Sequence, residues 1–316
     1  MELDIKDKKI LFELEKDARQ SNSSIAKSVG LSKDAVGYRI SKLEEKGVVR
    51  GYRTMIDVSK LGYTLYRIYF RWIDVSKEEL DKIIEFLKKD KGAWWIGKLD
   101  GSWDFAFAYW SKTNKEFYDF YEKLSEKFRK HIKDKLISPI LSYKEIPRRY
   151  LTNSKMTFDF KLENKKTEKF DEIDLKILRI LSKNSRTPLI EIASKLKVDN
   201  MTIFHRIKKL EEKKTILGYK IDLDVGKLGR DFYTVEIDLN NLSKFEELKS
   251  EIYSLPEMTA RSVSIGGNDI EFDLELENSQ EYYKIIDKLK DKFPSIREVR
   301  YFRVIENYKL IGMPEE

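Results

Sequence analysis

The sequence predicts an α+β protein in which one two-domain unit is written twice. Each unit has a helix-turn-helix domain followed by a ferredoxin-like βαββαβ domain. Two observations predict this: the chain of 316 residues resembles itself when shifted by about 167 positions, and the apolar period changes inside each copy. A spacing of three and four residues, typical of helices, gives way to the alternation typical of strands.

The internal repeat is clearest near the start of each copy. The stretch "DIKDKKILFELEKDARQSNSSIAKSVG" aligns with "DEIDLKILRILSKNSRTPLIEIASKLK", and "YRISKLEEKGVVRGYRTMIDVSKLG" aligns with "HRIKKLEEKKTILGYKIDLDVGKLG". Roughly two positions in five are identical over the first 60 residues, without a gap. The predicted domains are 1–62, 63–151, 170–229 and 230–316, with a polar linker over 152–169.

The helical domain of the first copy has three apolar-periodic segments within its first 50 residues. Gly30 is predicted to end the second helix, and Ser32 is a suitable N-cap for the third. This predicts a helix, a short turn and a second helix. The following "VVRGYRTMIDVSKLG" alternates and contains glycines, which predicts a small hairpin.

The remainder of each copy predicts the order βαββαβ. In the first copy "TLYRIYFRW", "AWWIGKL", "WDFAFAYW" and "KLISPILSYKEI" are the expected strands, and "KEELDKIIEFLKK" and "NKEFYDFYEKLSEKF" the expected helices. The second copy repeats this order from "DFYTVEIDL" to "IREVRYFRVIENY". This is the order of the split βαβ, ferredoxin-like sandwich.

Composition limits the functional classes. The chain has no Cys and two His, which disfavours thiolate, haem and transition-metal centres, so we expect no cofactor and no metal. The net charge of +7 and pI near 9.0 suit a polyanionic partner, although a lysine-rich solvated surface gives the same total. No run of about 18 apolar residues occurs, so we expect no membrane segment and a soluble, cytoplasmic protein.

The second helix of each helix-turn-helix presents polar and basic residues outward. In the first copy this outward set includes Ser32, Lys33, Asp34, Tyr38 and Lys42. In the second copy it includes Asp199, Asn200, Met201, Phe204, His205, Lys208 and Lys209. Arg39 and its counterpart Arg206 lie one turn further along, where they could reach a phosphate. An ordinary solvated helical hairpin is the alternative interpretation.

The run "LDIKDKKIL", "IAKSVGLSKDAV", "KLEEKGVVRGYR" and "KLGY", followed by a βαββαβ domain containing "GKLDGSWDF", resembles the Lrp/AsnC family of feast/famine transcriptional regulators. The resemblance covers nearly the whole chain. It implies winged helix-turn-helix domains that bind double-stranded DNA and βαββαβ domains that sense ligands and pair. The implied DNA-binding positions are Ser32, Lys33, Asp34, Tyr38, Arg39, Lys42, Asn200, Thr202, His205, Arg206 and Lys209.

The resemblance also implies an effector, such as an amino acid, between paired βαββαβ domains near the turn before the third strand. The matching positions here are Gly97, Asp100, Gly101 and Asp104. Small residues would let backbone amides approach a carboxylate, and an acidic group would accept the ligand's ammonium. The second copy departs from this pattern with Ser264, Gly267, Asn268 and Glu271. A plain β-turn is the alternative.

Taken with the duplication, the resemblance implies a non-enzymatic, sequence-specific regulator whose two units pair within one chain and read two non-identical half-sites. Further self-association through the βαββαβ domains is expected. An architectural DNA-binding protein of low specificity is one alternative. A decarboxylase of haem precursors, known on the same architecture, is another. A second helix-turn-helix that contacts protein instead of DNA, through Met201 and Phe204, is the third.

Overall fold

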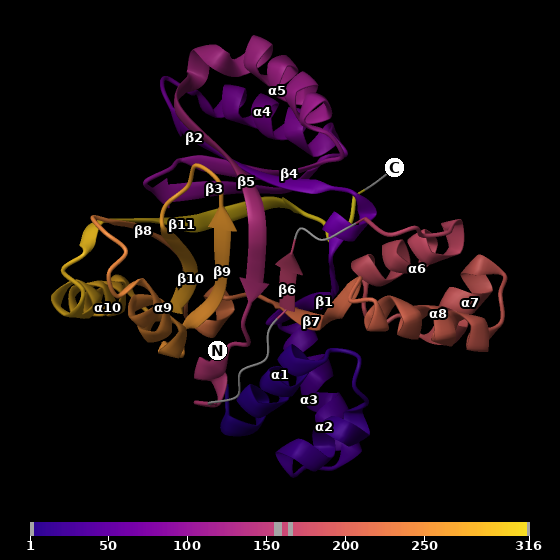
Figure 1. Ribbon diagram of the computed structural model, residues 1–316. Coiled ribbons are helices and arrows are strands. Elements are labelled where there is room, and N and C mark those ends of the chain that lie inside the picture. The colour runs from indigo at the N-terminus through magenta and orange to yellow at the C-terminus, as the bar shows by residue number, and fades with distance from the viewer. Residues whose placement is uncertain (1–2, 155–159, 164–166, 315–316) are drawn as a thin grey trace.

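Six helices build two three-helix domains in this computed structural model, which describes residues 3–154, 160–163 and 167–314 (Figure 1). The first domain contains α1 (Ile5–Lys16), α2 (Asn22–Val29) and α3 (Lys33–Glu45). The second contains α6 (Glu172–Lys183), α7 (Leu189–Leu196) and α8 (Asn200–Glu212). Gly30 ends α2 in the left-handed conformation and Ser32 caps α3, as predicted.

The strand that follows each three-helix domain pairs with its counterpart in the other copy. β1 (Val49–Ile56) and β7 (Ile216–Leu223) form a two-stranded antiparallel sheet, with Tyr52 opposite Ile221. The predicted hairpin within one copy is therefore wrong. Alternation reveals a strand but not its partner, and the partner here comes from the other half of the chain.

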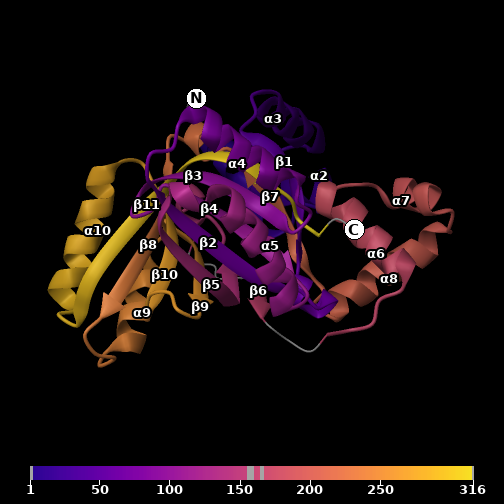
Figure 2. The same ribbon diagram turned by 90° about the horizontal axis from the view of Figure 1, so that it is seen from above.

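The βαββαβ order occurs twice, which confirms the predicted fold class. The first copy contains β2 (Thr64–Trp72), α4 (Lys77–Lys89), β3 (Ala93–Gly101), β4 (Phe105–Ser111), α5 (Asn114–Phe128) and β5 (Ile132–Glu145). The second contains β8 (Asp231–Leu239), α9 (Phe245–Ser254), β9 (Met258–Ser264), β10 (Ile270–Leu276), α10 (Ser279–Lys292) and β11 (Ile296–Leu310). The pair α4 and α5 lies far from α9 and α10 (Figure 1, Figure 2).

The last strand of each βαββαβ domain continues into the sheet of the other copy. β5 pairs with β2 as far as Ile140 and then with β9 through Glu145. In the same way β11 pairs with β8 as far as Arg303 and with β3 through Leu310. The strand order β2-β4-β3-β11-β8-β10-β9-β5, closed by the pairing of β2 with β5, makes one barrel-like sheet from two domains.

Part of the predicted linker over 152–169 is a strand. β6 (Phe160–Glu163) pairs antiparallel with the end of β5. Beyond it, the Glu168 carboxylate lies 3.3 Å from Nζ of Lys60 and 2.7 Å from Nζ of Lys213. The linker therefore contacts the segment after β1 and the end of α8; its residues 155–159 and 164–166 lie outside the described parts of the chain.

A buried network of charged side chains joins the first three-helix domain to the closed sheet. Nη1 of Arg148 lies 2.5 Å from Oε1 of Glu15 on α1, and its Nε lies 2.9 Å from Oε2 of Glu275 on β10. Nζ of Lys220 lies 3.3 Å from Glu15 and 2.8 Å from Glu145. Each charge has a partner of opposite sign, which offsets the cost of removing it from water.

The network also determines the protonation of its members. The Glu15 carboxyl is fully buried, which by itself would raise its pKa, yet Arg148 and Lys220 hold that pKa below the usual value. The pKa of Glu145 is likewise lowered, to about 2, by Arg53 and Lys220 against the effect of burial. Both carboxyls are therefore ionised at neutral pH.

We expect Arg148→Met to lower the free energy of unfolding by about 3–5 kcal/mol, because Glu15 and Glu275 would stay buried without their partner. Urea unfolding followed by circular dichroism measures the change. Arg50→Ala breaks the more exposed pair with Asp222 and serves as the control, with an expected change below about 0.5 kcal/mol. Equal losses in both variants would contradict a dominant role for the buried network.

Candidate nucleic-acid interface

The outward face of α3 carries most of the predicted DNA-binding residues of the first copy. Lys33, Asp34 and Lys42 are exposed, and Tyr38 is 67% exposed. The ammonium of Lys42 lies 5.8 Å from the centroid of the Tyr38 ring. Ser32 is exposed as well, but its hydroxyl accepts a hydrogen bond from the backbone N–H of Ala35 and caps the helix. The face therefore combines an exposed aromatic ring with two lysines.

The same face of α8 has different chemistry. Asn200, His205 and Lys209 are exposed, as predicted for residues that face a partner. Thr202 is half-buried, and its hydroxyl hydrogen-bonds to Asp199, the N-cap of α8. The Thr202 hydroxyl therefore stabilises the start of α8, and little of this side chain belongs to the outward surface.

Arg39 differs from the rest of the first set because it faces its own domain. Its Nη1 lies 2.7 Å from Oδ2 of Asp4 and 2.7 Å from Oδ1 of Asp7, at the start of α1. The backbone N–H of Asp7 and the Arg39 guanidinium together lower the pKa of Asp4. This contact fixes α3 against α1, and the contact of Arg39 with a phosphate stays a prediction.

The second copy repeats this contact with the same atoms. Nη1 of Arg206 lies 2.7 Å from Oδ2 of Asp171 and 2.8 Å from Oδ1 of Asp174. The contact of Arg206 with a phosphate likewise stays a prediction. We call each set of one arginine and two aspartates an arginine clamp. A clamp preserved in both copies holds both outward helices at one angle to their supporting helix.

The predicted effector turn lies where the two copies meet, and its groups already have partners. Oδ2 of Asp100 lies 2.6 Å from Nη2 of Arg303 on β11. Gly101 has a φ of +125°, and a Cβ there would lie 2.4 Å from the carbonyl oxygen of Tyr301. The Asp100 side chain is still 55% exposed, so the ion pair leaves its carboxylate open to solvent.

The other two predicted effector positions are also occupied by neighbours. An added Cβ at Gly97 would lie 2.6 Å from the Trp95 ring. The Asp104 carboxylate accepts a hydrogen bond of 2.8 Å from the backbone N–H of Trp72. The structure thus brings the four positions to the junction of the copies, while the effector role stays a prediction.

The sequence did not predict the charged interior of the closed sheet. Arg67 on β2 pairs with Glu271 on β10, which also accepts from the Ser262 hydroxyl. Burial raises the pKa of Asp273 to about 7 and that of Glu236 to about 7. These acidic residues alternate with apolar residues along their strands. That alternation is a weak sequence signal for polar groups on the inner face of the sheet.

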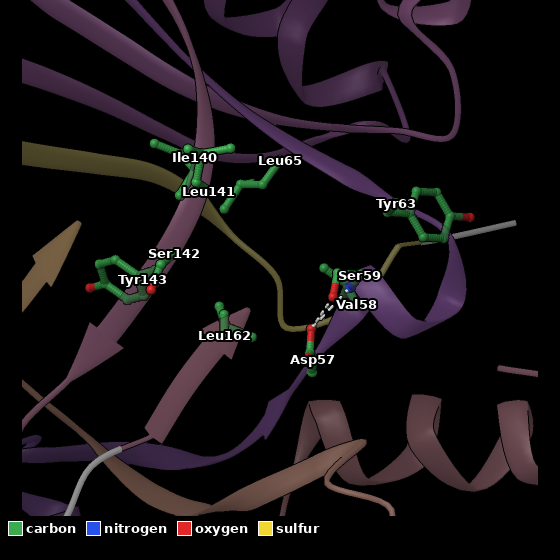
Figure 3. Close-up of a pocket in the computed structure, with 10 residues that line it drawn as sticks. All are labelled: Asp57, Val58, Ser59, Tyr63, Leu65, Ile140, Leu141, Ser142, Tyr143 and Leu162. Atoms are coloured by element: carbon green, nitrogen blue, oxygen red, sulfur yellow. Dashed lines mark hydrogen bonds between the residues drawn. The ribbon is translucent and has the colours of Figure 1, made fainter. Parts of the chain in front are cut away.

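Two hollows lie at the surface of the described residues, one small and one open. One, about 20 Å³ in volume, lies between the segment that follows β1 and strand β5, and Asp57, Val58, Leu65 and Ile140 are among its lining residues (Figure 3). Asp57 accepts hydrogen bonds from the backbone N–H and hydroxyl of Ser59. This hollow has room for about one water molecule and not for an amino acid.

A larger hollow is an open groove of about 510 Å³ at one end of α4 and α5. Phe86, Tyr109 and Phe120 form its apolar base, and Lys115 and Asp119 are among the charged residues of its rim. Within the described residues, His, Asp and Glu form no group of three that could hold a metal ion. No helix in these parts of the chain is long and apolar enough to cross a membrane.

Comparison with known proteins places both three-helix domains in one family. The model for winged helix-turn-helix DNA-binding domains matches residues 3–50 and 170–216. The chain is 44% identical over 87 residues to the HTH-type transcriptional regulator LrpA of Pyrococcus horikoshii, a match that covers 28% of this chain and 60% of the relative. It is 33% identical over 104 residues to an uncharacterised HTH-type transcriptional regulator of Pyrococcus furiosus, covering 33% of this chain and 69% of the relative. The chain belongs to the Lrp/AsnC family.

One solved structure resembles this Lrp/AsnC protein over nearly its whole length. The siroheme decarboxylase NirDL covers 98% of this chain and 94% of its own, with a TM-score of 0.66 and 15% identity. NirDL has also been solved in complex with an iron-uroporphyrin III analogue, with a TM-score of 0.65. At this identity the likeness shows a common fold. The relatives named above are matched over less of their length, since LrpA is covered to 60%.

The arginine clamps predict a particular coupling between residues. Arg39→Gln should lower DNA affinity by releasing α3 from α1, and Asp4→Asn with Asp7→Asn should do the same. Combining all three changes should add little further loss, because each variant breaks the same contact. Fluorescence anisotropy with a labelled DNA fragment measures the cycle.

Additive losses would contradict the clamp and favour direct contact between Arg39 and DNA. The matched control is Lys42→Ala, because Lys42 is exposed on the same helix and makes no ion pair among the described residues. Its effect should add to that of Asp4→Asn with Asp7→Asn.

Proposed function

We propose that this protein is a site-specific DNA-binding transcriptional regulator in which one chain supplies both DNA-reading helices. One observation carries the proposal: α3 and α8 are held by equivalent arginine clamps and leave their outward faces open. Lys33, Asp34 and Lys42 have no ion-pair partner within the described residues. A face that the fold leaves without partners, on a helix of the kind that enters the major groove, suits a nucleic acid.

The two helices read non-identical half-sites in this proposal. Where α3 carries Lys33, Asp34 and Tyr38, the equivalent positions of α8 carry Asn200, Met201 and His205. Hydrogen-bonding groups and apolar groups select different base edges. The bound site should therefore lack a strict inverted repeat, and one chain should occupy it in a single orientation. Such a role implies a location with the DNA in the cytoplasm.

Low-specificity architectural binding is the main alternative among DNA-binding functions. The chain carries +7 over 316 residues, a modest charge for a protein that wraps DNA without reading it. Lysines on the outward faces are accompanied by Tyr38 and by Asn200, which can contact base edges. These features favour sequence preference.

The likeness to NirDL raises an enzymatic alternative, which we propose does not apply. Of the chain's two His, His131 is buried with its Nε2 3.0 Å from Oε1 of Glu79, and His205 is exposed on α8. The hollow near Asp57 is far below the several hundred cubic ångströms of pockets that enclose such ligands. The groove at α4 and α5 is open to solvent, so it would not exclude water from a reacting group.

The first experiment is binding to DNA from the chain's own upstream region, compared with random DNA, at several salt concentrations. We expect preference for the upstream fragment and a linear fall of log affinity with log salt. Lys42→Ala and Lys209→Ala should each reduce that slope by about one if each lysine contacts a phosphate. Lys82→Ala, an exposed lysine on α4, is the control and should leave the slope unchanged.

Equal binding to both fragments would favour the architectural alternative. Absence of binding at low salt would contradict the proposed function. An iron porphyrin added to the same protein then tests the enzymatic alternative: a shifted Soret band that saturates at one equivalent would support it.

A further inference from the structure

Two large apolar side chains lie exposed side by side on the outward face of α8. Met201 is 58% exposed and Phe204 is 42% exposed, and their spacing of three residues places them on one face of the helix. The same positions of α3 hold Asp34 and Gly37. The apolar surface is therefore a property of the second copy and not of the shared scaffold.

Polar and basic residues surround this apolar pair. Asn200 precedes Met201, and His205, Lys208 and Lys209 follow Phe204, all exposed. The Phe204 ring lies 5.5 Å from the His205 ring, so the two rings pack together at the surface. An apolar pair ringed by lysines matches a partner that combines apolar groups with negative charge. The major groove of DNA is such a partner, since thymine presents a C5-methyl group between phosphates.

We propose that the second recognition helix selects its half-site through thymine methyl groups that contact Met201 and Phe204. This inference rests on the proposed DNA-binding function and adds the chemistry of one half-site. Asn200, one residue before Met201, has the amide that pairs with adenine N6 and N7. The half-site of α8 is accordingly rich in T·A pairs, while Lys33 gives α3 a donor suited to guanine.

Contact of Met201 and Phe204 with DNA requires no movement of the buried residues of α8. Ile203 and Ile207, the core-facing residues of α8, are buried, whereas Phe204 beside them is 42% exposed. The N-cap at Asp199 and the clamp at Arg206 fix the helix at both ends of this segment. A substitution at Phe204 should therefore change the surface and leave the fold intact.

The test replaces thymine by deoxyuridine, which lacks the methyl group but keeps the same hydrogen-bonding edge. The site is first selected from random DNA with the full chain. Its thymines are then replaced in one half-site at a time, and dissociation constants are measured for wild type and Phe204→Ala. We expect wild type to lose about fourfold in affinity for each contacted methyl in one half-site. Phe204→Ala should show little of that loss, because the methyl partner is already gone.

Tyr118→Ala, which removes an exposed aromatic ring from α5, is the matched control and should behave as wild type. Deoxyuridine effects of equal size in wild type and Phe204→Ala would overturn the inference. Unchanged affinity after Met201→Ala with Phe204→Ala would also overturn it and would assign this face to a protein partner. In both cases specific DNA binding by wild type would still support the proposed regulator function. Failure of wild type to bind any selected DNA would contradict that function.

Discussion

The exchange of β5 and β11 between the two βαββαβ domains is the constraint on which the rest of the structure depends. Each strand completes its own sheet with one half and the other copy's sheet with the other half. A ferredoxin-like sheet alone would leave strand edges open, and the exchange pairs them. Because the partner is in the same chain, its effective concentration is high and fixed. The pairing of β1 with β7 then brings the two three-helix domains into one continuous core.

The duplication places equivalent residues in the two copies, but equivalent residues make different contacts. Glu15 of α1 enters the buried network with Arg148, whereas its counterpart Ser182 on α6 packs against Gly312, where an added Cβ would lie 3.2 Å from the Ser182 carbonyl oxygen. The equivalent position is thus a buried charge in one copy and a small residue close to the C-terminal segment in the other. The outward faces of α3 and α8 differ as well, so the asymmetry extends to the surface that we propose reads DNA.

Much of this architecture could be predicted from the sequence because it is local. Caps such as Ser32 and Gly30, the helical period and the βαββαβ order each depend on neighbouring residues. The exchange of strands depends on register between segments more than 100 positions apart, which alternation does not encode. The strand β6 lies in a polar segment and could not be predicted from its own residues, because it is defined by its pairing with β5.

The exposed positions of the candidate site were predicted from the sequence, and the arginine clamps were not. The exposed positions Lys33, Tyr38 and Lys42 follow from helical periodicity, which separates the outward face from the core. Arg39 was predicted to reach a phosphate because it lies one turn beyond the outward residues of α3. Its partners in the structure, Asp4 and Asp7, recur with it in the second copy, so the repeat contained a signal for the clamp. Buried Arg148 and Lys220 ran against the usual exposure of their residue types.

The central claim is that one chain carries two working and different DNA-reading helices, held by one closed sheet. Hydroxyl-radical footprinting on a selected site tests it most directly, with wild type, Lys208→Glu with Lys209→Glu, and Lys33→Glu with Lys42→Glu. The account predicts two protected half-sites for wild type and the loss of a different half in each variant. Loss of the same half in both variants, or a wild-type footprint after the changes in α8, would contradict it.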